Sequence, residues 1–211
     1  MKFVFLGPPG AGKGTLAAEA AKHYNIPHIS TGAMFRAAIK NHTPLGEKIQ
    51  SIISSGALVD DATTAALVKE RLAAADVGNG FILDGFPRTI VQAEMLSEFC
   101  TLDAVVNFDI SDEAVIKRLS GRRLCPSCGK NFHIDFMKPQ IDGVCDNCNG
   151  SLIIREDDKT EAIMERLETY RTQTFPLIEF YRAKKLLITL DAQPAPAVIL
   201  ESFIKLFPRK Q

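Results

Sequence analysis

A glycine-rich segment near the start of the chain has the spacing of a phosphate-binding loop. Between a short apolar run and a helical pattern, the chain reads Gly7-Pro8-Pro9-Gly10-Ala11-Gly12-Lys13-Gly14-Thr15. Glycine tolerates backbone dihedrals that other residues avoid, so successive N–H groups can wrap around an anion at the start of a helix. Lys13 stands where its ammonium group would reach β- and γ-phosphoryl oxygens. A simple turn would not need a lysine there, so the segment predicts binding of nucleotide phosphates.

Four of the five cysteines form two tight pairs. The pairs are Cys125-x2-Cys128 and Cys145-x2-Cys148, with sixteen residues between them. Each pair can hold one metal ion from a tight turn, and four thiolates complete a tetrahedron, which predicts a structural zinc site. Two disulfides are the alternative, which a reducing compartment disfavours. Cys100 stands alone, and we expect it to be a small buried apolar residue.

Composition and charge narrow the class of protein. The chain has 211 residues, of which 46% are hydrophobic, enough for one sizeable core with room for inserted segments. Lysine plus arginine equals aspartate plus glutamate at 25 each, so the basic excess typical of nucleic-acid-binding proteins is missing. The first apolar run is too short for a signal peptide or a membrane span. We therefore expect a soluble, cytoplasmic protein that binds neither nucleic acid nor membrane.

Short apolar runs alternate with longer helical patterns, which predicts an α/β fold with a parallel sheet flanked by helices. The expected strands are Lys2–Leu6, Pro27–Ile29, Phe81–Leu83, Ala104–Asp109 and Leu187–Leu190. The expected helices are Lys13–Tyr24, Gly32–Asn41, Leu45–Ser54, Asp61–Ala75, Thr89–Cys100, one capped by Ser111, Thr160–Lys185 and Ala195–Phe207. The polar, cysteine-rich stretch from Arg123 to Asp158 has no helical period, and we interpret it as an insertion.

Three further groups of residues follow the phosphate loop along the chain. The first is Ser30-Thr31-Gly32-Ala33-Met34-Phe35-Arg36. The second is Leu83-Asp84-Gly85-Phe86-Pro87-Arg88-Thr89, followed by Gln92. The third is Gly121-Arg122-Arg123 together with Arg155-Glu156-Asp157-Asp158. With the two glycines around Lys13, these segments resemble the adenylate kinase family from Lys2 to about Tyr181.

This resemblance implies a P-loop nucleoside monophosphate kinase fold in three parts. The core would comprise residues 1–29, 60–121 and 160–211, the AMP-binding insert residues 30–59, and the zinc lid residues 122–159. The family activity is the reversible transfer of a phosphoryl group from Mg-ATP to AMP, giving two ADP, in nucleotide homeostasis. The resemblance thus implies ATP, AMP and ADP as small-molecule partners, a magnesium ion bound with ATP, a structural zinc ion, and a monomer.

The resemblance also assigns residues to these ligands. ATP binding would fall to Gly10, Ala11, Gly12, Lys13, Gly14, Thr15, Arg118 and Arg122. AMP binding would fall to Thr31, Arg36, Gly85, Arg88, Gln92, Arg155 and Arg166. Phosphoryl transfer needs alignment and charge cancellation more than covalent help, so the catalytic groups would be Lys13, Arg88, Arg122, Arg155 and Arg166. Asp84, at the end of a predicted strand, is expected to bind magnesium through water.

Some of these residues have plainer interpretations. Arg118, Arg122 and Arg123 follow a predicted helix, and cations are favoured near any helix C-terminus. Gln92, taken alone, would be an exposed glutamine on a helix. His133 lies close to the cysteines, but four thiolates already complete the metal shell. We therefore expect His133 either to pack within the lid or to contact nucleotide.

The sequence departs from the expected pattern at two positions. Gly14 stands where a common phosphate loop has a serine or threonine that touches magnesium, and Thr15 comes next. Ala33 stands where the family commonly has aspartate after Thr-Gly, so no residue is assigned to the hydration around the acceptor phosphate.

Asp157 and Asp158 would either pair with the arginines of the lid or be solvated.

Three other functions fit parts of the sequence. Another nucleoside monophosphate kinase would differ only in its acceptor, and tests with AMP, UMP, CMP and GMP separate the two. A zinc-ribbon nucleic-acid-binding protein would explain the cysteines but not Lys13, Arg88 or the neutral charge. A P-loop regulatory protein would bind nucleotide without transferring phosphate, which leaves the arginines without a purpose.

Overall fold

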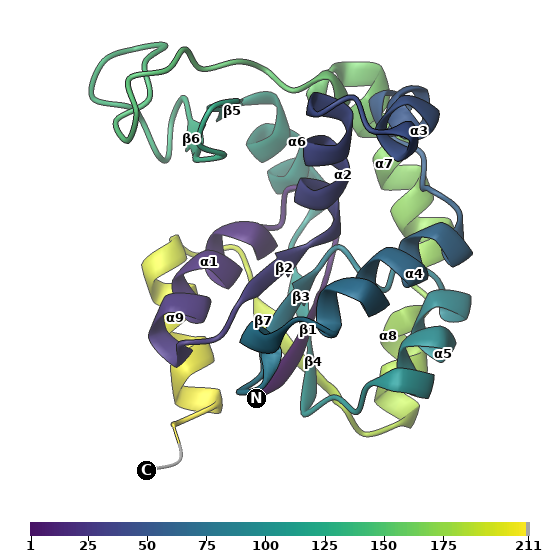
Figure 1. Ribbon diagram of the computed structural model, residues 1–211. Coiled ribbons are helices and arrows are strands. Elements are labelled where there is room, and N and C mark those ends of the chain that lie inside the picture. The colour runs from purple at the N-terminus through teal and green to yellow at the C-terminus, as the bar shows by residue number, and fades with distance from the viewer. Residues whose placement is uncertain (210–211) are drawn as a thin grey trace.

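The computed structural model describes residues 1–209 and has five strands in one parallel sheet (Figure 1). The strands are β1 (Lys2–Leu6), β2 (His28–Ser30), β3 (Phe81–Asp84), β4 (Ala104–Asp109) and β7 (Leu187–Asp191). Their order across the sheet is β2-β3-β1-β4-β7, and every neighbouring pair is parallel. The predicted strands are confirmed, with ends shifted by at most one residue.

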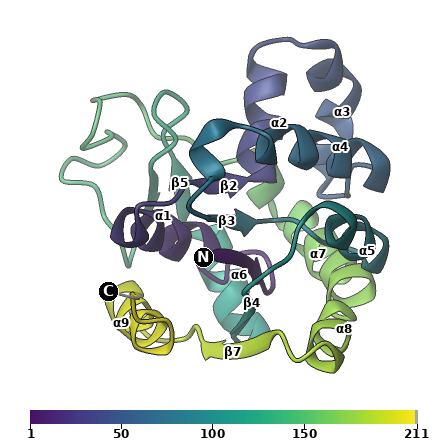
Figure 2. The ribbon, with the colours of Figure 1, turned by 60° about the horizontal axis from the view of Figure 1, so that its bottom comes forward.

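Helices cover both faces of this sheet, as Figure 2 shows. On one face lie α1 (Lys13–Tyr24) and α9 (Pro196–Leu206). On the other face lie α4 (Asp61–Leu72), α5 (Ile90–Phe99) and α8 (Leu177–Ala183). Side chains alternate along a strand, so Phe3 and Phe5 of β1 join the first apolar cluster, whereas Val4 and Leu6 join the second. The predicted α/β class, with a parallel sheet between helices, is confirmed.

Two segments stand apart from these layers. Residues 30–59, here called the α2–α3 segment, contain α2 (Thr31–Lys40) and α3 (Pro44–Ser55) around a small core of Phe35, Ile49 and Val59. Residues 122–159, here called the cysteine segment, contain the antiparallel pair β5 (Arg122–Leu124) and β6 (Asn131–His133). The helix α6 (Asp112–Ser120) leads from β4 into the cysteine segment. Figure 1 shows both segments at the same end of the sheet.

Local capping explains where several of these helices begin. Ser111 accepts a hydrogen bond from the backbone N–H of Ala114 at 3.4 Å, as predicted for the start of α6. Thr43 caps α3 through the N–H of Gly46 at 3.0 Å. Such caps occupy N–H groups that the first turn of a helix otherwise leaves unpaired.

The prediction of one long helix over Thr160–Lys185 is wrong. The chain forms α7 (Thr160–Thr169), then a π-helical turn at Tyr170–Thr174, and then α8. The N–H of Phe175 reaches the carbonyl of Tyr170 at 2.8 Å, which widens the turn by one residue. Pro176 follows and has no N–H to continue the helical ladder.

The prediction that Cys100 is buried is also wrong. It follows α5 and packs against the apolar cluster under that helix, but it stays partly exposed. Within residues 1–209, none of the helices combines the length and the apolar character needed to cross a membrane.

Candidate active site

A cleft of about 1500 Å³ lies at the carboxyl ends of the central strands. Parallel α/β sheets place ligands at this edge, because loops from neighbouring strands diverge there. The phosphate loop, α2, α6, α7 and the cysteine segment all line the cleft. Its volume exceeds that of a site for one drug-sized molecule, which is about 300–1000 Å³. The cleft therefore has room for more than one nucleotide-sized ligand.

The phosphate loop connects β1 to α1 at the floor of the cleft. Gly12 caps α1 with φ of 93°, a left-handed conformation that favours glycine. A Cβ atom at Gly10 would lie 2.8 Å from Cγ of Leu119, so the loop packs closely on α6. Gly10, Gly12, Gly14 and Thr15 line the cleft, whereas Ala11 is buried and outside its lining.

Lys13 is the cation of this loop. Its Nζ donates hydrogen bonds to the carbonyls of Gly7 at 2.7 Å and Pro8 at 2.8 Å. Burial lowers the pKa of Lys13 to about 8, and the nearby charge of Asp84 opposes that shift. The ammonium group of Lys13 therefore lies at the floor of the cleft. An anion bound there would stabilise the protonated form of this lysine.

Asp84 lies at the end of β3, next to the phosphate loop. A Cβ atom at Gly14 would lie 3.2 Å from its Oδ2, so the glycine that breaks the usual motif leaves room for this carboxylate. Burial alone would raise the pKa of Asp84, but His28 and the charge of Lys13 outweigh burial and keep the pKa below its usual range. An ionised carboxylate facing a phosphate loop has the donor chemistry for a hydrated magnesium ion.

His28 is a residue that the sequence analysis missed. It lies in the edge strand β2, and its Nε2 is 3.4 Å from Oδ2 of Asp84. Within residues 1–209 this buried nitrogen has no partner with hydrogen-bond geometry. Parallel pairing of β2 with β3 brings the two residues together. No local motif around His28 carries that information.

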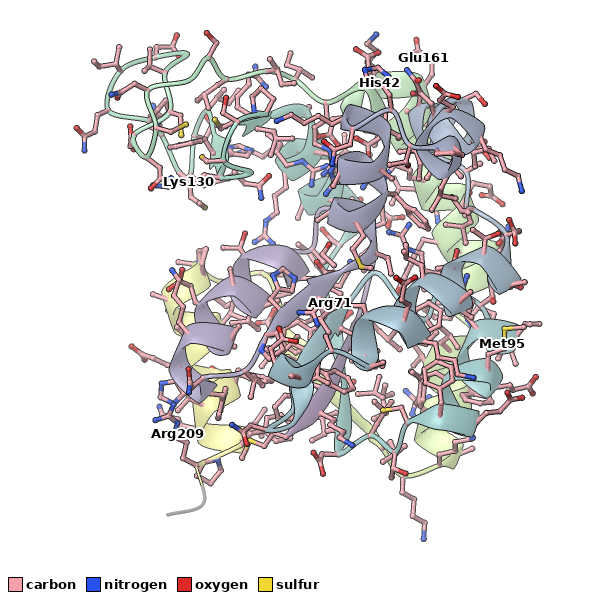
Figure 3. All side chains as sticks on the ribbon, viewed as in Figure 1. His42, Arg71, Met95, Lys130, Glu161 and Arg209 are labelled. Carbon is pink, nitrogen blue, oxygen red and sulfur yellow. The ribbon has the colours of Figure 1, made fainter. Side chains whose placement is uncertain are left out.

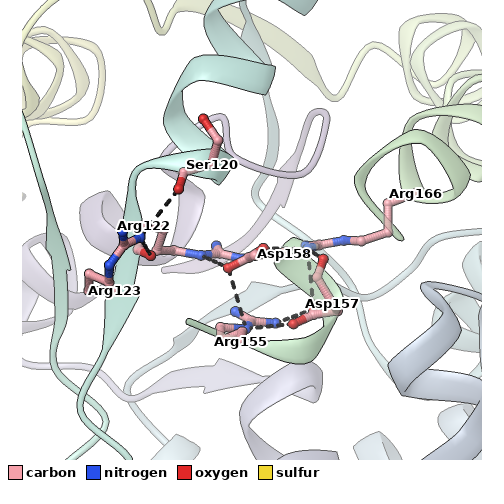
Figure 4. Close-up of polar contacts among 7 residues, drawn as sticks. All are labelled: Ser120, Arg122, Arg123, Arg155, Asp157, Asp158 and Arg166. Atoms are coloured by element: carbon pink, nitrogen blue, oxygen red, sulfur yellow. Dashed lines mark hydrogen bonds and ion pairs between the residues drawn. The ribbon is translucent and has the colours of Figure 1, made fainter. Parts of the chain in front are cut away.

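Three arginines meet two aspartates where the cysteine segment joins α7 (Figure 4). Arg122 donates to Asp158 through Nε at 2.6 Å and also through its NH2 group. Arg166 donates to Asp158 Oδ1 at 2.9 Å, and Arg155 donates to Asp157 Oδ1 at 2.8 Å. The side chain of Asp158 is 0% exposed. The structure thus favours the interpretation in which both aspartates pair with arginines.

Burial and charge act against each other in this group. Burial alone would raise the pKa of Asp157, but Arg166 and Arg155 lower it to about 2. Burial lowers the pKa of Arg166 to about 10, with Asp157 opposing the shift. Arg122, Arg155 and Arg166 all line the cleft, so this ionised group faces the same space as Lys13.

Two neighbouring arginines differ in where they point. Arg118 donates to the carbonyls of Ala11 at 3.3 Å and Gln193 at 3.0 Å, and it lines the cleft beside the phosphate loop. Arg123 instead donates to the carbonyls of Ser120 and Arg122 and is not part of the cleft lining (Figure 4). Arg123 thus lies on the other side of β5 from Arg122, because successive residues of a strand point to opposite sides.

A second group of predicted residues surrounds a side cavity of about 60 Å³ that opens beside α2. The hydroxyl of Thr31 and Nε of Arg88 each donate to the carbonyl of Gly85 at 2.9 Å. Burial lowers the pKa of Arg36 to about 9 and also lowers the pKa of Arg88. The predicted residues that line this cavity are Thr31, Arg36, Gly85, Arg88, Gln92, Arg155 and Arg166.

Gln92 is buried, so it is not the exposed helix residue of the plainer interpretation. Its Oε1 accepts from the backbone N–H of Arg88 at 2.7 Å. Its Nε2 donates to Oδ1 of Asp61 at 2.9 Å. The amide therefore braces the segment that carries Arg88 while lining the side cavity.

The four paired cysteines converge in the cysteine segment. Their sulfur atoms all lie within 4.8 Å of one another. Zinc–sulfur bonds of about 2.3 Å place the sulfurs of a tetrahedral site roughly 3.8 Å apart, so the four cysteines fit one zinc ion. Cys125 and Cys145 are buried, whereas Cys128 and Cys148 are exposed. The predicted quartet is thus brought together as a metal-ligand set.

The two cysteine pairs sit in matching turns. The N–H of Gly129 bonds the carbonyl of Cys125 at 2.9 Å, and the N–H of Asn149 bonds that of Cys145 at 2.8 Å. Gly129 and Asn149 both have positive φ, at 76° and 56°. This left-handed residue after each pair turns the chain back, as expected for a zinc-binding turn.

His133 belongs to the packing of this segment. Its Nδ1 accepts from the N–H groups of Asp135 at 2.9 Å and Phe136 at 3.2 Å. Its ring packs on Phe136 with centroids 4.4 Å apart. His133 is buried and also lines the cleft, so its packing within the segment is confirmed and its contact with nucleotide stays a prediction.

Comparison with known proteins places this geometry in a family. The sequence model of the family described as adenylate kinase matches residues 5–186. An adenylate kinase from Treponema denticola is 62% identical over 208 residues, covering 99% of this chain and 100% of the relative. Adenylate kinases from Acetivibrio thermocellus and Treponema pallidum are 50% and 49% identical, over 92% and 95% of this chain and 91% and 96% of the relatives. The chain therefore belongs to the adenylate kinase family.

Proposed function

We propose that this chain catalyses the reversible transfer of the γ-phosphoryl group of ATP to AMP, giving two ADP. Its membership in the adenylate kinase family supports this activity. The observation that carries the proposal is the set of cations around one cleft. Lys13, Arg36, Arg88, Arg118, Arg122, Arg155 and Arg166 reach it from separate segments. A binding protein without chemistry would not need so many cations around one transferred group.

We assign the donor to the phosphate loop. Backbone N–H groups of Gly10–Thr15 and the start of α1 would hold the ATP phosphates, with Arg118 and Arg122 beside them. Lys13 would leave the carbonyls of Gly7 and Pro8 and follow the charge of the γ-phosphoryl group as it moves. Ala11 would contribute through its backbone alone, because its side chain is buried.

We assign the acceptor to the side cavity and its rim. Arg36 and Arg88 would grip the AMP phosphate with forked donors, with Thr31 and Gly85 shaping the wall. Arg155 and Arg166 would stabilise the charge that builds between donor and acceptor. The side-chain amide of Gln92 already makes hydrogen bonds with Arg88 and Asp61. To contact the adenine, the amide would have to give up one of these hydrogen bonds or share it with the base.

Two metals belong to the proposal. Asp84 would hold a magnesium ion through water, and that ion would neutralise charge on the ATP phosphates. Cys125, Cys128, Cys145 and Cys148 would hold a structural zinc ion. All four thiolates are used by one tetrahedral ion, so none would touch phosphate.

The proposed parts of the chain follow from these assignments. The α2–α3 segment (30–59) would be the AMP-binding insert, the cysteine segment (122–159) the lid, and the remaining residues the core. The even charge balance supports a protein that does not bind nucleic acid. We further propose a cytoplasmic monomer. Paired cysteines used as metal ligands suit a reducing compartment, and sedimentation of the purified protein tests the monomer.

A coupled assay tests the activity. Purified protein with Mg-ATP and AMP should produce two ADP per turnover, and the reverse reaction should occur from ADP. UMP, CMP and GMP in place of AMP separate this function from that of another nucleoside monophosphate kinase. Folded, zinc-loaded protein that makes no ADP above background contradicts the proposal.

A further inference from the structure

The α2–α3 segment and the cysteine segment touch directly across the mouth of the cleft. Nζ of Lys40, at the C-terminal end of α2, donates a hydrogen bond to the carbonyl of Pro126 at 3.0 Å. Both residues line the cleft. Within residues 1–209, no other hydrogen bond or ion pair joins these two segments. Figure 1 shows the segments at the same end of the sheet.

The acceptor of this bond belongs to the first zinc-binding turn. Pro126 follows Cys125 and precedes Cys128 by two residues, so the position of its carbonyl depends on the turn that these two ligands define. The N–H of Cys125 bonds the carbonyl of Lys130 at 3.0 Å, which closes the turn from its other end. The carbonyl therefore sits on the part of the segment that metal binding would hold most firmly.

Charge favours the same contact. Four thiolates carry more negative charge than one zinc ion neutralises, so a loaded site is anionic. Lys40 is an exposed cation on the opposite segment, and it reaches the residue next to a ligand. An ammonium group beside an anionic cluster gains Coulomb energy, which salt weakens at an exposed site.

We propose that Lys40 is a positioning residue that latches the α2–α3 segment to the first zinc-binding turn. The latch holds the two segments together over the cleft in the free protein. Lys40 acts through the cysteine segment and has no role in the transfer itself. The proposed zinc site thereby acquires a second purpose, as the docking point for the opposite segment.

The latch makes the binding of the two nucleotides interdependent. Suppose that ATP orders the cysteine segment and AMP orders the α2–α3 segment. A contact between the two segments then lets the binding of either nucleotide favour the binding of the other. Linkage then requires that AMP tighten the ATP site by the same factor as ATP tightens the AMP site. This coupling rests on the proposed function in one respect, which is the identity of the two ligands as ATP and AMP.

Distance measurement in the nucleotide-free, zinc-loaded protein tests the latch itself. Spin labels would be attached through genetically encoded amino acids at Glu47 and Asp142, because cysteine labelling would attack the zinc ligands. Lys40→Met should shift the population to longer distances, and Lys40→Arg should restore the short one. Lys48→Met, which removes another exposed lysine of the α2–α3 segment, is the matched control and should change nothing. Equal distributions in Lys40→Met and the unmodified protein overturn the proposal.

Calorimetric binding tests the coupling. The Kd of a non-hydrolysable ATP analogue would be measured with and without saturating AMP, and the ratio of the two values is the coupling factor. Lys40→Met should reduce this factor about two- to fivefold, the range for one exposed charged contact. Lys48→Met should leave it unchanged. If Lys40→Met weakens either nucleotide alone and preserves the factor, Lys40 contacts nucleotide and the latch is wrong. If the unmodified protein binds neither nucleotide, the proposed function fails, and the distance measurement still decides the latch.

Discussion

The core cleft and the cysteine segment both hold charged groups in place, but they do so by different means. In the core, Lys13 begins α1 and Asp84 ends β3, and both elements bury apolar side chains in the two clusters of the sheet. In the cysteine segment, only Phe132 and two of the cysteines are buried apolar residues, and the chain is mostly irregular. Order in the core comes from packing, whereas order in the cysteine segment would come from the proposed zinc ion and from ion pairs.

This difference predicts two kinds of mutational response. A charged side chain in the core can be removed without loss of the fold, because the backbone that positions it is held by apolar contacts. A ligand or ion-pair partner in the cysteine segment cannot be removed so freely, because it is part of what holds the backbone.

Lys13→Met and Arg88→Ala should each lower kcat by about 10²–10³, the usual cost of losing one group that stabilises transition-state charge. The melting temperature should hardly change, because the surrounding clusters remain intact. Rates come from the coupled assay and folding from circular dichroism. Lys22→Met on the same helix and Arg182→Ala on the surface are matched controls. Near-normal rates in both variants would remove these residues from the mechanism.

Cys128→Ser should release the zinc ion and lower the melting temperature, while transfer remains measurable at low temperature. Structural zinc contributes about 10–16 kcal/mol of apparent binding energy in small peptides, part of which here would order the cysteine segment. Metal analysis and calorimetry check both effects, with Cys100→Ser as the control that leaves the quartet intact. A zinc-free protein that is equally heat-stable but inactive would place the metal in the chemistry instead.

Asp158→Asn should destabilise the protein by about 3 kcal/mol, because it removes one charge from a buried group of ion pairs. Arg122 and Arg166 would lose their ionised partner while remaining partly buried. Denaturant unfolding measures the change, and Asp142→Asn on the exposed part of the cysteine segment is the control. A loss no larger than that of the control would show that the aspartate is solvated in solution.

The value of kcat/KM should fall as pH rises, and its pH profile should bend downward near pH 8. Burial lowers the pKa of Lys13 to about 8, and the protonated form is the one that attracts phosphate. The proton is therefore present below this pKa and lost as pH rises through it. Above this bend the rate constant should fall about tenfold per pH unit. Bound phosphate stabilises the proton, so kcat should fall at higher pH than kcat/KM. Lys13→Arg should move the bend to higher pH, and an unchanged bend would assign it to another group.

Local sequence predicted the parts of the site that local structure creates. The phosphate loop, the cysteine turns and the ends of β1 and β3 depend on neighbouring residues, so spacing alone revealed them. Contacts between distant segments were harder to predict. His28 lies beside Asp84 only because β2 pairs with β3, and Arg123 points away only because β5 is a strand. The π-helical turn before Pro176 interrupts a pattern that otherwise fits one helix.

The last helix, α9, packs on the first strand, β1, and this contact has a consequence for synthesis of the chain. Phe203 of α9 packs against Phe3 and Phe5 of β1, with ring centroids 5.4 Å apart in each pair. Tyr24 also meets Phe203, at 5.9 Å. Phe3 and Phe5 are thus translated long before Phe203, their partner on α9. Until then the part of this face that α9 covers stays open to chaperones and to association with other nascent chains.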